Sequence, residues 1–164
     1  MNEQLNSKVK IIIATLDDYP IIQNMARFYV YDRTPFMGWE PEENGMFECI
    51  DFKHYFESHD KKAYLVRTNH NELVGFVLLD KQKLVEPIDW NMGEFFILAK
   101  FQSKGVAWYV AEQIFKAHPG QWSVAVMPEN LKAYKFWRRA VVKASGDNFT
   151  EIFKNKDELD RFKN

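Results

Sequence analysis

The sequence predicts a single mixed α/β domain that spans residues 1–164. Two observations support this fold class. Residues 95–98 (FFIL) form a continuous apolar run of strand-favouring residues, which is typical of a strand covered on both faces. Shortly after Gly105, apolar residues recur at near-helical spacing as far as Phe115. The chain therefore passes from a buried strand directly into an amphipathic helix, and similar segments alternate along its whole length.

Composition and charge exclude several function classes. Hydrophobic residues make up 46% of the chain and the net charge is −1, which argues against a general nucleic-acid or membrane-surface binder. No apolar stretch is long enough for a membrane span, and the N-terminus lacks the apolar core of a signal peptide. Cys49 is the single cysteine, so we expect a packed thiol in a reducing compartment. A cytoplasmic protein without nucleic-acid or membrane partners is expected.

The first half of the chain alternates a strand, helices and a polar loop. Asp17 and Asp18 suit the N-terminus of a helix, and Pro35 disfavours helical conformation in the residue before it. The expected elements are a strand at 8–14, a helix from 17 to about 31, an acidic and aromatic loop at 35–48, and a helix at 50–58.

The second half is richer in strands. Asn69 to Glu72 has the composition of a hairpin turn, and His118-Pro119-Gly120 is a helix stop signal. The expected elements are strands at 63–68 and 73–79, a central strand from about 89, a helix from 105 to 117, a strand at 122–127, a helix from 128 to about 143 and a last strand at 149–153. The predicted order is β-α-α-β-β-β-α-β-α-β.

The loop between the central strand and the following helix predicts an anion site. The backbone N–H groups of residues 103–107 lie in the first turn of the helix, where they lack intrahelical acceptors. Gly105 has no side chain to hold a phosphate away, and Lys104 adds positive charge. We interpret this loop as a pyrophosphate cradle. The alternative is an ordinary strand–turn–helix whose glycine eases the corner.

This loop resembles the Gln/Arg-x-x-Gly-x-Gly/Ala signature of the GCN5-related N-acetyltransferases, the GNAT superfamily. The matching residues are Gln102, Ser103, Lys104, Gly105, Val106 and Ala107. A second segment, MPENLKAYKFW, is similar to the family's Asn-x-x-Ala motif through Asn130 and Ala133. The predicted element order is similar to that of the GNAT fold along nearly the whole chain. Without the resemblance, Asn130 would be interpreted as a helix cap.

The resemblance implies a mixed sheet that splays apart between its fourth and fifth strands. The pantetheine of acetyl-CoA would enter this gap, pair with the backbone of Ile97 and Leu98, and lie near Asn130. Many relatives carry a tyrosine that protonates the leaving thiolate; here that position, beside the thiol, is Trp137. Tyr134, one helical turn earlier, is the candidate acid in its place, with simple packing as the alternative.

The remaining site residues are expected around the acceptor. Glu94 is the candidate general base, directly or through water, with a salt-bridged strand carboxylate as the alternative. Four aromatic residues are candidates for the acceptor site: Tyr29, Tyr31, Phe36 and Trp39. Together with neighbouring carboxylates they suit a cationic amine, although a solvated acidic loop gives the same pattern. The four histidines show no ligand spacing, so no metal site is expected.

These observations predict an acetyl-CoA-dependent N-acetyltransferase that acts on a primary amine of a small molecule. A non-catalytic acyl-CoA-binding module is the alternative, because Trp137 replaces the usual acid. A nucleotide-binding protein is a weaker alternative, since no Gly-x-x-x-x-Gly-Lys-Ser/Thr loop is present. A homodimer is compatible with the sequence but is not specified by it.

Overall fold

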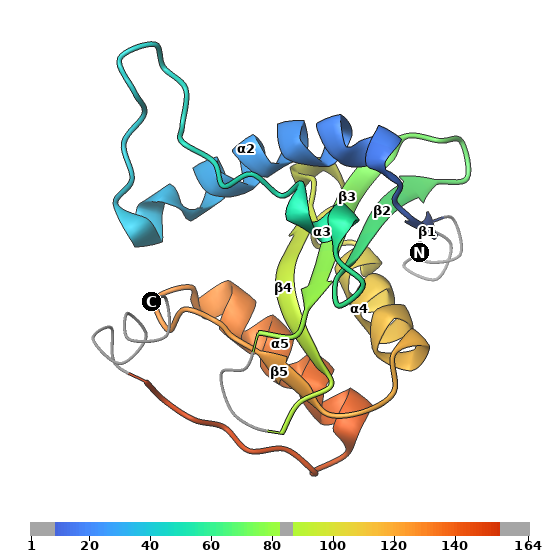
Figure 1. Cartoon of the computed structure of the whole chain (residues 1–164). Helices are drawn as coiled ribbons and strands as arrows, with labels where there is room; N and C mark the ends of the chain where they lie inside the picture. Colours follow the sequence, from blue (N-terminus) through green and yellow to red (C-terminus); the bar gives the residue numbers. More distant parts are fainter. Residues whose placement is uncertain (1–8, 83–86, 155–164) are drawn as a thin grey trace.

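The computed structural model describes residues 9–82 and 87–154 (Figure 1). Its centre is a five-stranded sheet in the order β1-β2-β3-β4-β5. Neighbouring strands are antiparallel except for β4 and β5, which are parallel. The strands are β1 (Val9–Ile13), β2 (Lys62–Thr68), β3 (Leu73–Asp80), β4 (Trp90–Ile97) and β5 (Trp122–Val124). The predicted mixed α/β class is confirmed.

Helices cover both faces of the sheet (Figure 1). They are α2 (Tyr19–Met37), α3 (His54–Glu57), α4 (Val106–Ala117) and α5 (Leu131–Ser145), with short 3-10 turns at Leu16–Asp18 and Ala99–Phe101. Each face has its own buried cluster. Phe76, Leu78 and Phe96 pack with Ile22 of α2 on one face. Alternate strand residues pack against α4 on the other face, because successive side chains of a strand point to opposite sides.

A β-bulge in β4 determines which way Glu94 points. Leu78 of β3 pairs with Glu94, whereas the next residue pairs with Met92, so Gly93 is an extra residue in β4. In a regular strand Met92 and Glu94 would face the same side. With the extra residue, Met92 joins the cluster under α4, while Glu94 faces Arg33 of α2.

The sheet opens between its last two strands. Only Trp90, Asn91 and Met92 of β4 pair with β5, which ends at Val124 instead of residue 127 as predicted. Among the described residues, β4 has no strand partner on this side beyond Met92. The expected splay between the fourth and fifth strands is therefore present, and it accounts for the shorter β5.

Helix α2 continues past its predicted end and includes Pro35. The proline nitrogen cannot donate to the carbonyl of Tyr31, but the Thr34 hydroxyl donates to that oxygen at 2.8 Å. Because this oxygen is satisfied, the helix continues to Met37, where Gly38 ends it in the left-handed conformation (φ 67°). The prediction that the helix stops near residue 31 is wrong for this reason.

Two other elements of the structure differ from those predicted from the sequence. The second helix is only His54–Glu57, because Gln23 of α2 holds the chain before it: the Gln23 amide donates to the Ile50 carbonyl and accepts from the Phe52 N–H, both at 2.9 Å. The strand predicted at 149–153 is wrong. This segment forms no strand, and Glu151 instead pairs with Tyr134 and Arg138 of α5.

Candidate active site

The loop at residues 102–107 is shaped by two residues in the left-handed region. Ser103 has φ 58° and Gly105 has φ 79°, and Gly105 immediately precedes α4. The Gln102 amide donates to the carbonyl of Ile97 at 2.7 Å and so ties the loop to the end of β4. This curvature gathers backbone N–H groups at the positive end of α4, which is the geometry of an anion-binding nest.

The open edge of β4 provides backbone groups for a ligand, although not at every predicted residue. Both backbone groups of Leu98 already have partners, because its N–H donates to the Val74 carbonyl and its carbonyl accepts from the Phe101 N–H, both at 2.8 Å. Backbone groups alternate between the two sides of a strand, so those of Phe95 and Ile97 point away from β3. The Ile97 carbonyl is taken by Gln102. The N–H of Ile97 and both backbone groups of Phe95 face the gap.

A small cavity lies where the strands diverge. Its walls come from α2, β4, β5 and α5, and the lining residues are Tyr29, Met92, Gly93, Phe95, Val124, Ala125 and Trp137. The Trp137 indole packs edge-on against the Phe95 ring, with centroids 4.9 Å apart. Trp137 thus closes the α5 side of the gap.

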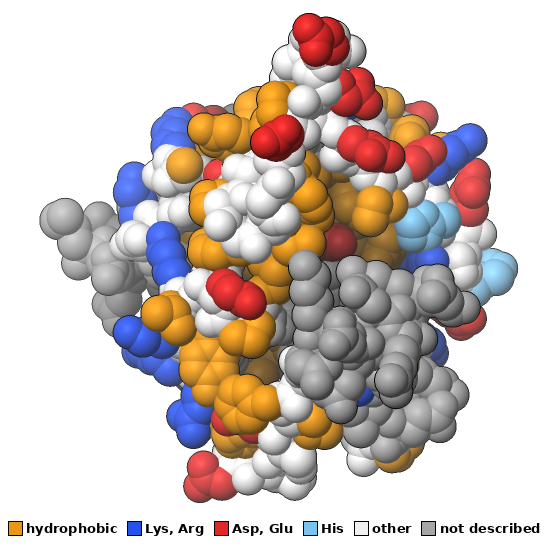
Figure 2. Space-filling model, turned by 90° about the vertical axis from the view of Figure 1, so that its left-hand side faces the viewer, with side chains coloured by type: hydrophobic (Ala, Val, Ile, Leu, Met, Phe, Trp, Pro, Cys, Tyr) orange, Lys and Arg blue, Asp and Glu red, His pale blue; other side chains and the backbone are white. Residues whose placement is uncertain are grey.

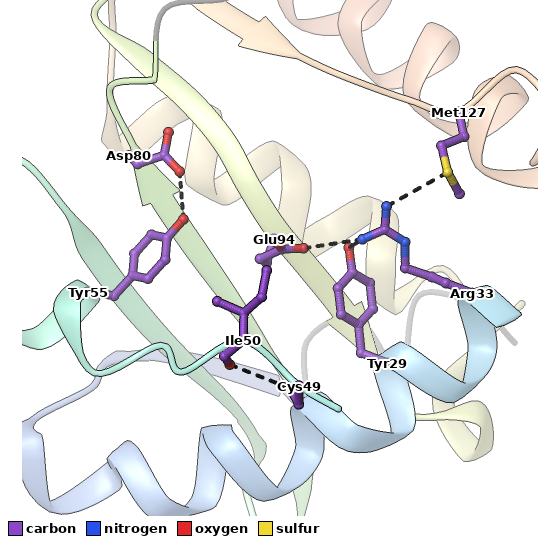
Figure 3. A network of polar contacts seen from close by, with 8 residues as sticks. All are labelled: Tyr29, Arg33, Cys49, Ile50, Tyr55, Asp80, Glu94 and Met127. Atoms are coloured by element: carbon purple, nitrogen blue, oxygen red, sulfur yellow. Dashed lines mark hydrogen bonds and ion pairs between the residues drawn. The ribbon is translucent and has the colours of Figure 1, made fainter. Parts of the chain in front are cut away.

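Glu94 lies beside this cavity in a polar cluster with Tyr29 and Arg33 (Figure 3). The Arg33 guanidinium is 3.9 Å from the Glu94 carboxylate and donates to the Tyr29 hydroxyl at 3.2 Å. It also lies over the rings of Tyr29 and Trp39, at 5.2 Å and 5.8 Å from their centroids. Tyr29 links the cavity to the polar cluster, because it lines the cavity and its hydroxyl accepts a hydrogen bond from Arg33.

Burial dominates the electrostatics of this cluster. The Glu94 side chain is 18% exposed, and burial raises the pKa of its carboxyl group, although Tyr29 and Arg33 act in the opposite direction. Burial and the nearby Glu94 carboxylate raise the pKa of Tyr29. Glu94 is therefore a stronger base than an exposed glutamate, and Tyr29 stays protonated.

Asn130 of the second motif and the nearby Tyr134 have different surroundings. Asn130 caps α5, with its side-chain oxygen accepting from the Ala133 N–H at 3.1 Å, so the helix-cap interpretation holds. The Tyr134 hydroxyl donates to Glu151, and this hydrogen bond raises the pKa of Tyr134. Tyr134 does not line the described cavity. The hydroxyl of Tyr134 therefore has its partner in the C-terminal segment.

The four acceptor-site candidates do not gather in one place. Tyr29 and Trp39 share the Arg33 guanidinium. Tyr31 is 61% exposed and contacts the ring of Phe47 in the projecting loop. Figure 2 shows acidic side chains along this projecting segment and hydrophobic side chains below it, with one acidic side chain recessed among them. The contact with Arg33 therefore separates Tyr29 and Trp39 from Tyr31, which packs against the projecting loop.

Arg33 and the buried polar chain across the sheet were not among the predicted site residues. Asn91 donates to Asp80 at 2.9 Å and accepts from Ser123 at 2.6 Å, so one network joins β3, β4 and β5. Tyr29 and Arg33 are four residues apart, which places both on one face of a helix. This spacing was an available sequence signal for Arg33. Nothing in the sequence pairs Asn91 with Ser123, since that contact depends on sheet register.

A family model described as the acetyltransferase (GNAT) family matches residues 25–141. The chain belongs to the GNAT family. No curated protein sequence matches this GNAT chain. Within the described residues, no helix is long and apolar enough to cross a membrane, and no three His, Cys, Asp or Glu side chains are grouped to hold a metal ion.

Solved structures resemble this GNAT domain in fold. The YycN protein of Bacillus subtilis has a TM-score of 0.61 at 15% identity, covering 90% of this chain and 97% of that one. An acetyltransferase from Thermus thermophilus has a TM-score of 0.63 at 15% identity and covers 91% of each chain. A spermidine N-acetyltransferase from Vibrio cholerae, in complex with CoA and spermine, has a TM-score of 0.61 at 16% identity, with 82% and 80% covered. At these identities the likeness concerns the fold.

Proposed function

We propose that this GNAT domain transfers the acetyl group of acetyl-CoA to a primary amine of a small molecule. The observation that carries the proposal is the cavity between β4 and β5. It lies at the free edge of β4, and Tyr29, which lines it, is bound to Arg33 in the Glu94 cluster. An acyl donor on one side and an amine on the other would meet at this cavity.

The residues present fit the parts of acetyl-CoA. The nest formed by Ser103 and Gly105 suits the pyrophosphate, and Lys104 is exposed beside it. The pantetheine amides can pair with the open backbone groups of Phe95 and Ile97, as an added strand would. The amide nitrogen of Asn130 is a further donor, since its oxygen serves the helix cap. The thiol end would then lie near Trp137.

The chemistry requires a nucleophilic amine and a reactive thioester. The amine nitrogen forms a bond to the thioester carbonyl carbon, the carbon–sulfur bond breaks, and CoA leaves as its thiolate. Glu94 accepts the proton that the ammonium form of the acceptor must lose, directly or through water. The geometry assigns no side-chain acid to the thiolate. The acceptor nitrogen must lose a second proton as the amide forms, and the thiolate takes its proton from this nitrogen or from water. Holding both reactants in the gap supplies most of the rate enhancement.

A non-catalytic acyl-CoA-binding module remains the second candidate. One observation favours it: Tyr134 donates to Glu151, and Trp137 cannot act as an acid. Such a module would bind CoA through the same loop without turnover. The two candidates differ only in whether acetyl groups reach an amine, so turnover separates them.

Two measurements test the proposal. Isothermal titration with CoA measures binding, and release of free thiol from acetyl-CoA over a panel of primary amines measures transfer. We expect micromolar CoA binding and amine-dependent thiol release, with the acetylated amine detected by mass spectrometry. CoA binding without transfer to any amine would favour the binding module. Absence of CoA binding by the folded protein would overturn both.

Location and assembly remain predictions. A cytoplasmic location follows from composition alone and is tested by fractionating cells that express the tagged protein. A Vibrio cholerae spermidine N-acetyltransferase of similar fold is dodecameric. For this chain the sequence is compatible with a homodimer, which light scattering coupled to size-exclusion chromatography would detect as twice the mass of 19.5 kDa.

A further inference from the structure

Arg33 is a largely buried cation with few oxygen partners. Its side chain is 29% exposed, and its guanidinium has five N–H donors. Within the described part of the chain, one oxygen lies within hydrogen-bond distance, the hydroxyl of Tyr29 at 3.2 Å. The other contact is the thioether of Met127 at 3.9 Å, a weak acceptor, and the Glu94 carboxylate is also 3.9 Å away. Guanidinium donors that are largely buried normally bind carboxylate or phosphate oxygens, so the donors of Arg33 suit an anionic partner.

The position of the guanidinium is determined by its neighbours. It rests over the rings of Tyr29 and Trp39, whose faces attract a cation. Tyr29 and Trp39 are two of the aromatic residues predicted from the sequence to bind a cationic acceptor. The Arg33 guanidinium already lies over both rings. A polyamine would bring additional positive charge against Arg33, which is unfavourable in a partly desolvated site. The cluster therefore disfavours acceptors that carry only positive charge.

Arg33 and Glu94 together present opposite charges side by side. Their charged groups are 3.9 Å apart, on α2 and β4 respectively, next to the cavity lined by Tyr29 (Figure 3). In an α-amino acid, one carbon separates the amino group from the carboxylate. These two groups could engage Glu94 and Arg33 at the same time, with the amine at the base that must deprotonate it. The planar guanidinium offers the paired donors that a carboxylate accepts.

We propose, on the basis of the function proposed above, that the acceptor is an α-amino acid whose carboxylate binds Arg33 while its amino group is acetylated beside Glu94. This assigns Arg33 as the residue that determines acceptor class. A free carboxylate is the preferred anion because the Glu94 carboxylate lies 3.9 Å from the guanidinium and would repel a more highly charged phosphate more strongly.

Matched acceptors test the proposal directly. The probes are the proteinogenic L-amino acids, each compared with its α-carboxamide, together with putrescine and spermidine as acceptors without a carboxylate. For the best amino acid we expect kcat/KM to exceed that of its carboxamide by roughly ten- to a hundred-fold, which is the effect of losing one charge-assisted contact. Arg33→Gln should remove this preference, and Arg33→Lys should retain part of it.

Arg27→Gln is the matched control, because it removes one positive charge from an exposed position of the same helix. It should keep the preference for the free carboxylate, and CoA affinity measured by titration should be unchanged in all three variants. Faster acetylation of carboxamides or polyamines than of amino acids, with further acceleration in Arg33→Gln, would overturn this inference and leave the acetyltransferase function intact. Failure of every amine despite CoA binding would overturn both.

Discussion

The carboxylate of Asp80 accepts a hydrogen bond from the hydroxyl of Tyr55 at 2.6 Å, and this contact lies directly against the backbone of Gly93. A Cβ atom on Gly93 would lie 2.5 Å from the Asp80 carboxylate and 2.6 Å from the Tyr55 hydroxyl. The bulge that directs Glu94 toward Arg33 is therefore packed against a buried hydrogen bond, and a residue at this position needs to lack a side chain.

Gly93→Ala should accordingly destabilise the protein by about 1–3 kcal/mol, because the added methyl group must displace the Tyr55–Asp80 pair. Urea denaturation followed by circular dichroism measures this change. The same substitution in a Tyr55→Phe background should cost less, since the hydroxyl that the methyl group meets is then absent. Equal costs in both backgrounds would show that the hydrogen bond does not constrain the bulge.

Glu94→Gln should lower kcat by roughly 10²–10⁴-fold, because a general base is lost, with less effect on the apparent KM for acetyl-CoA. In the wild-type protein, kcat at saturating acceptor should fall as pH decreases and Glu94 becomes protonated. Burial raises the pKa of this carboxyl group, so the midpoint should lie above 4.5. The variant should lose this acidic limb. A variant with the wild-type rate and profile would show that Glu94 has a structural role.

The same pKa shift has a consequence for stability. A carboxyl group whose pKa is higher in the folded than in the unfolded state favours folding when it is protonated, and this contribution is lost as pH rises through the folded-state pKa. At neutral pH the ionised Glu94 therefore opposes folding, although Arg33 offsets part of the cost. Glu94→Gln should be less destabilising at pH 7 than at pH 4, which thermal melts at the two pH values would measure.

Substitutions at Gly105 test the pyrophosphate cradle. At φ 79° a side chain is strained, but Asn and Asp tolerate this conformation better than other residues. Gly105→Asn and Gly105→Asp are nearly equal in size and differ in charge. The aspartate variant should bind CoA at least tenfold more weakly than the asparagine variant, since it places an anion where the phosphates lie. Lys104→Ala, at an exposed position, should weaken binding only a few-fold. Equal CoA affinity of the two Gly105 variants would remove the pyrophosphate assignment.

Trp137→Phe should leave kcat within roughly tenfold of the wild type, because it changes the packing against Phe95 and removes no proton donor to the thiolate. Tyr134→Phe should have no effect on kcat, since the hydroxyl of Tyr134 already donates to Glu151. Steady-state kinetics at saturating acetyl-CoA checks both. A large loss of kcat in Tyr134→Phe with unchanged CoA affinity would identify Tyr134 as the missing acid.

The sequence by itself determined the features that depend on neighbouring residues. The 102–107 loop was recognisable because the glycine, the basic residue and the start of the helix lie within a few positions of one another. Asn130 was placed at the start of a helix for the same reason, and the structure shows it as a cap. The apolar run at 95–98 identified the central strand, since burial on both faces leaves a continuous local signal.

The tertiary structure decided the features that depend on contacts between distant segments. Arg33 reaches Glu94 because α2 continues past residue 31 and the bulge at Gly93 turns Glu94 toward that helix. The segment at 149–153 has the composition of a strand, yet Glu151 pairs with α5 instead. Local propensity is worth a fraction of a kcal/mol per residue, so long-range hydrogen bonds and packing override it. The contacts of Arg33 with Glu94 and Trp39 were therefore hidden from the sequence, whereas the loop at 102–107 was visible in it.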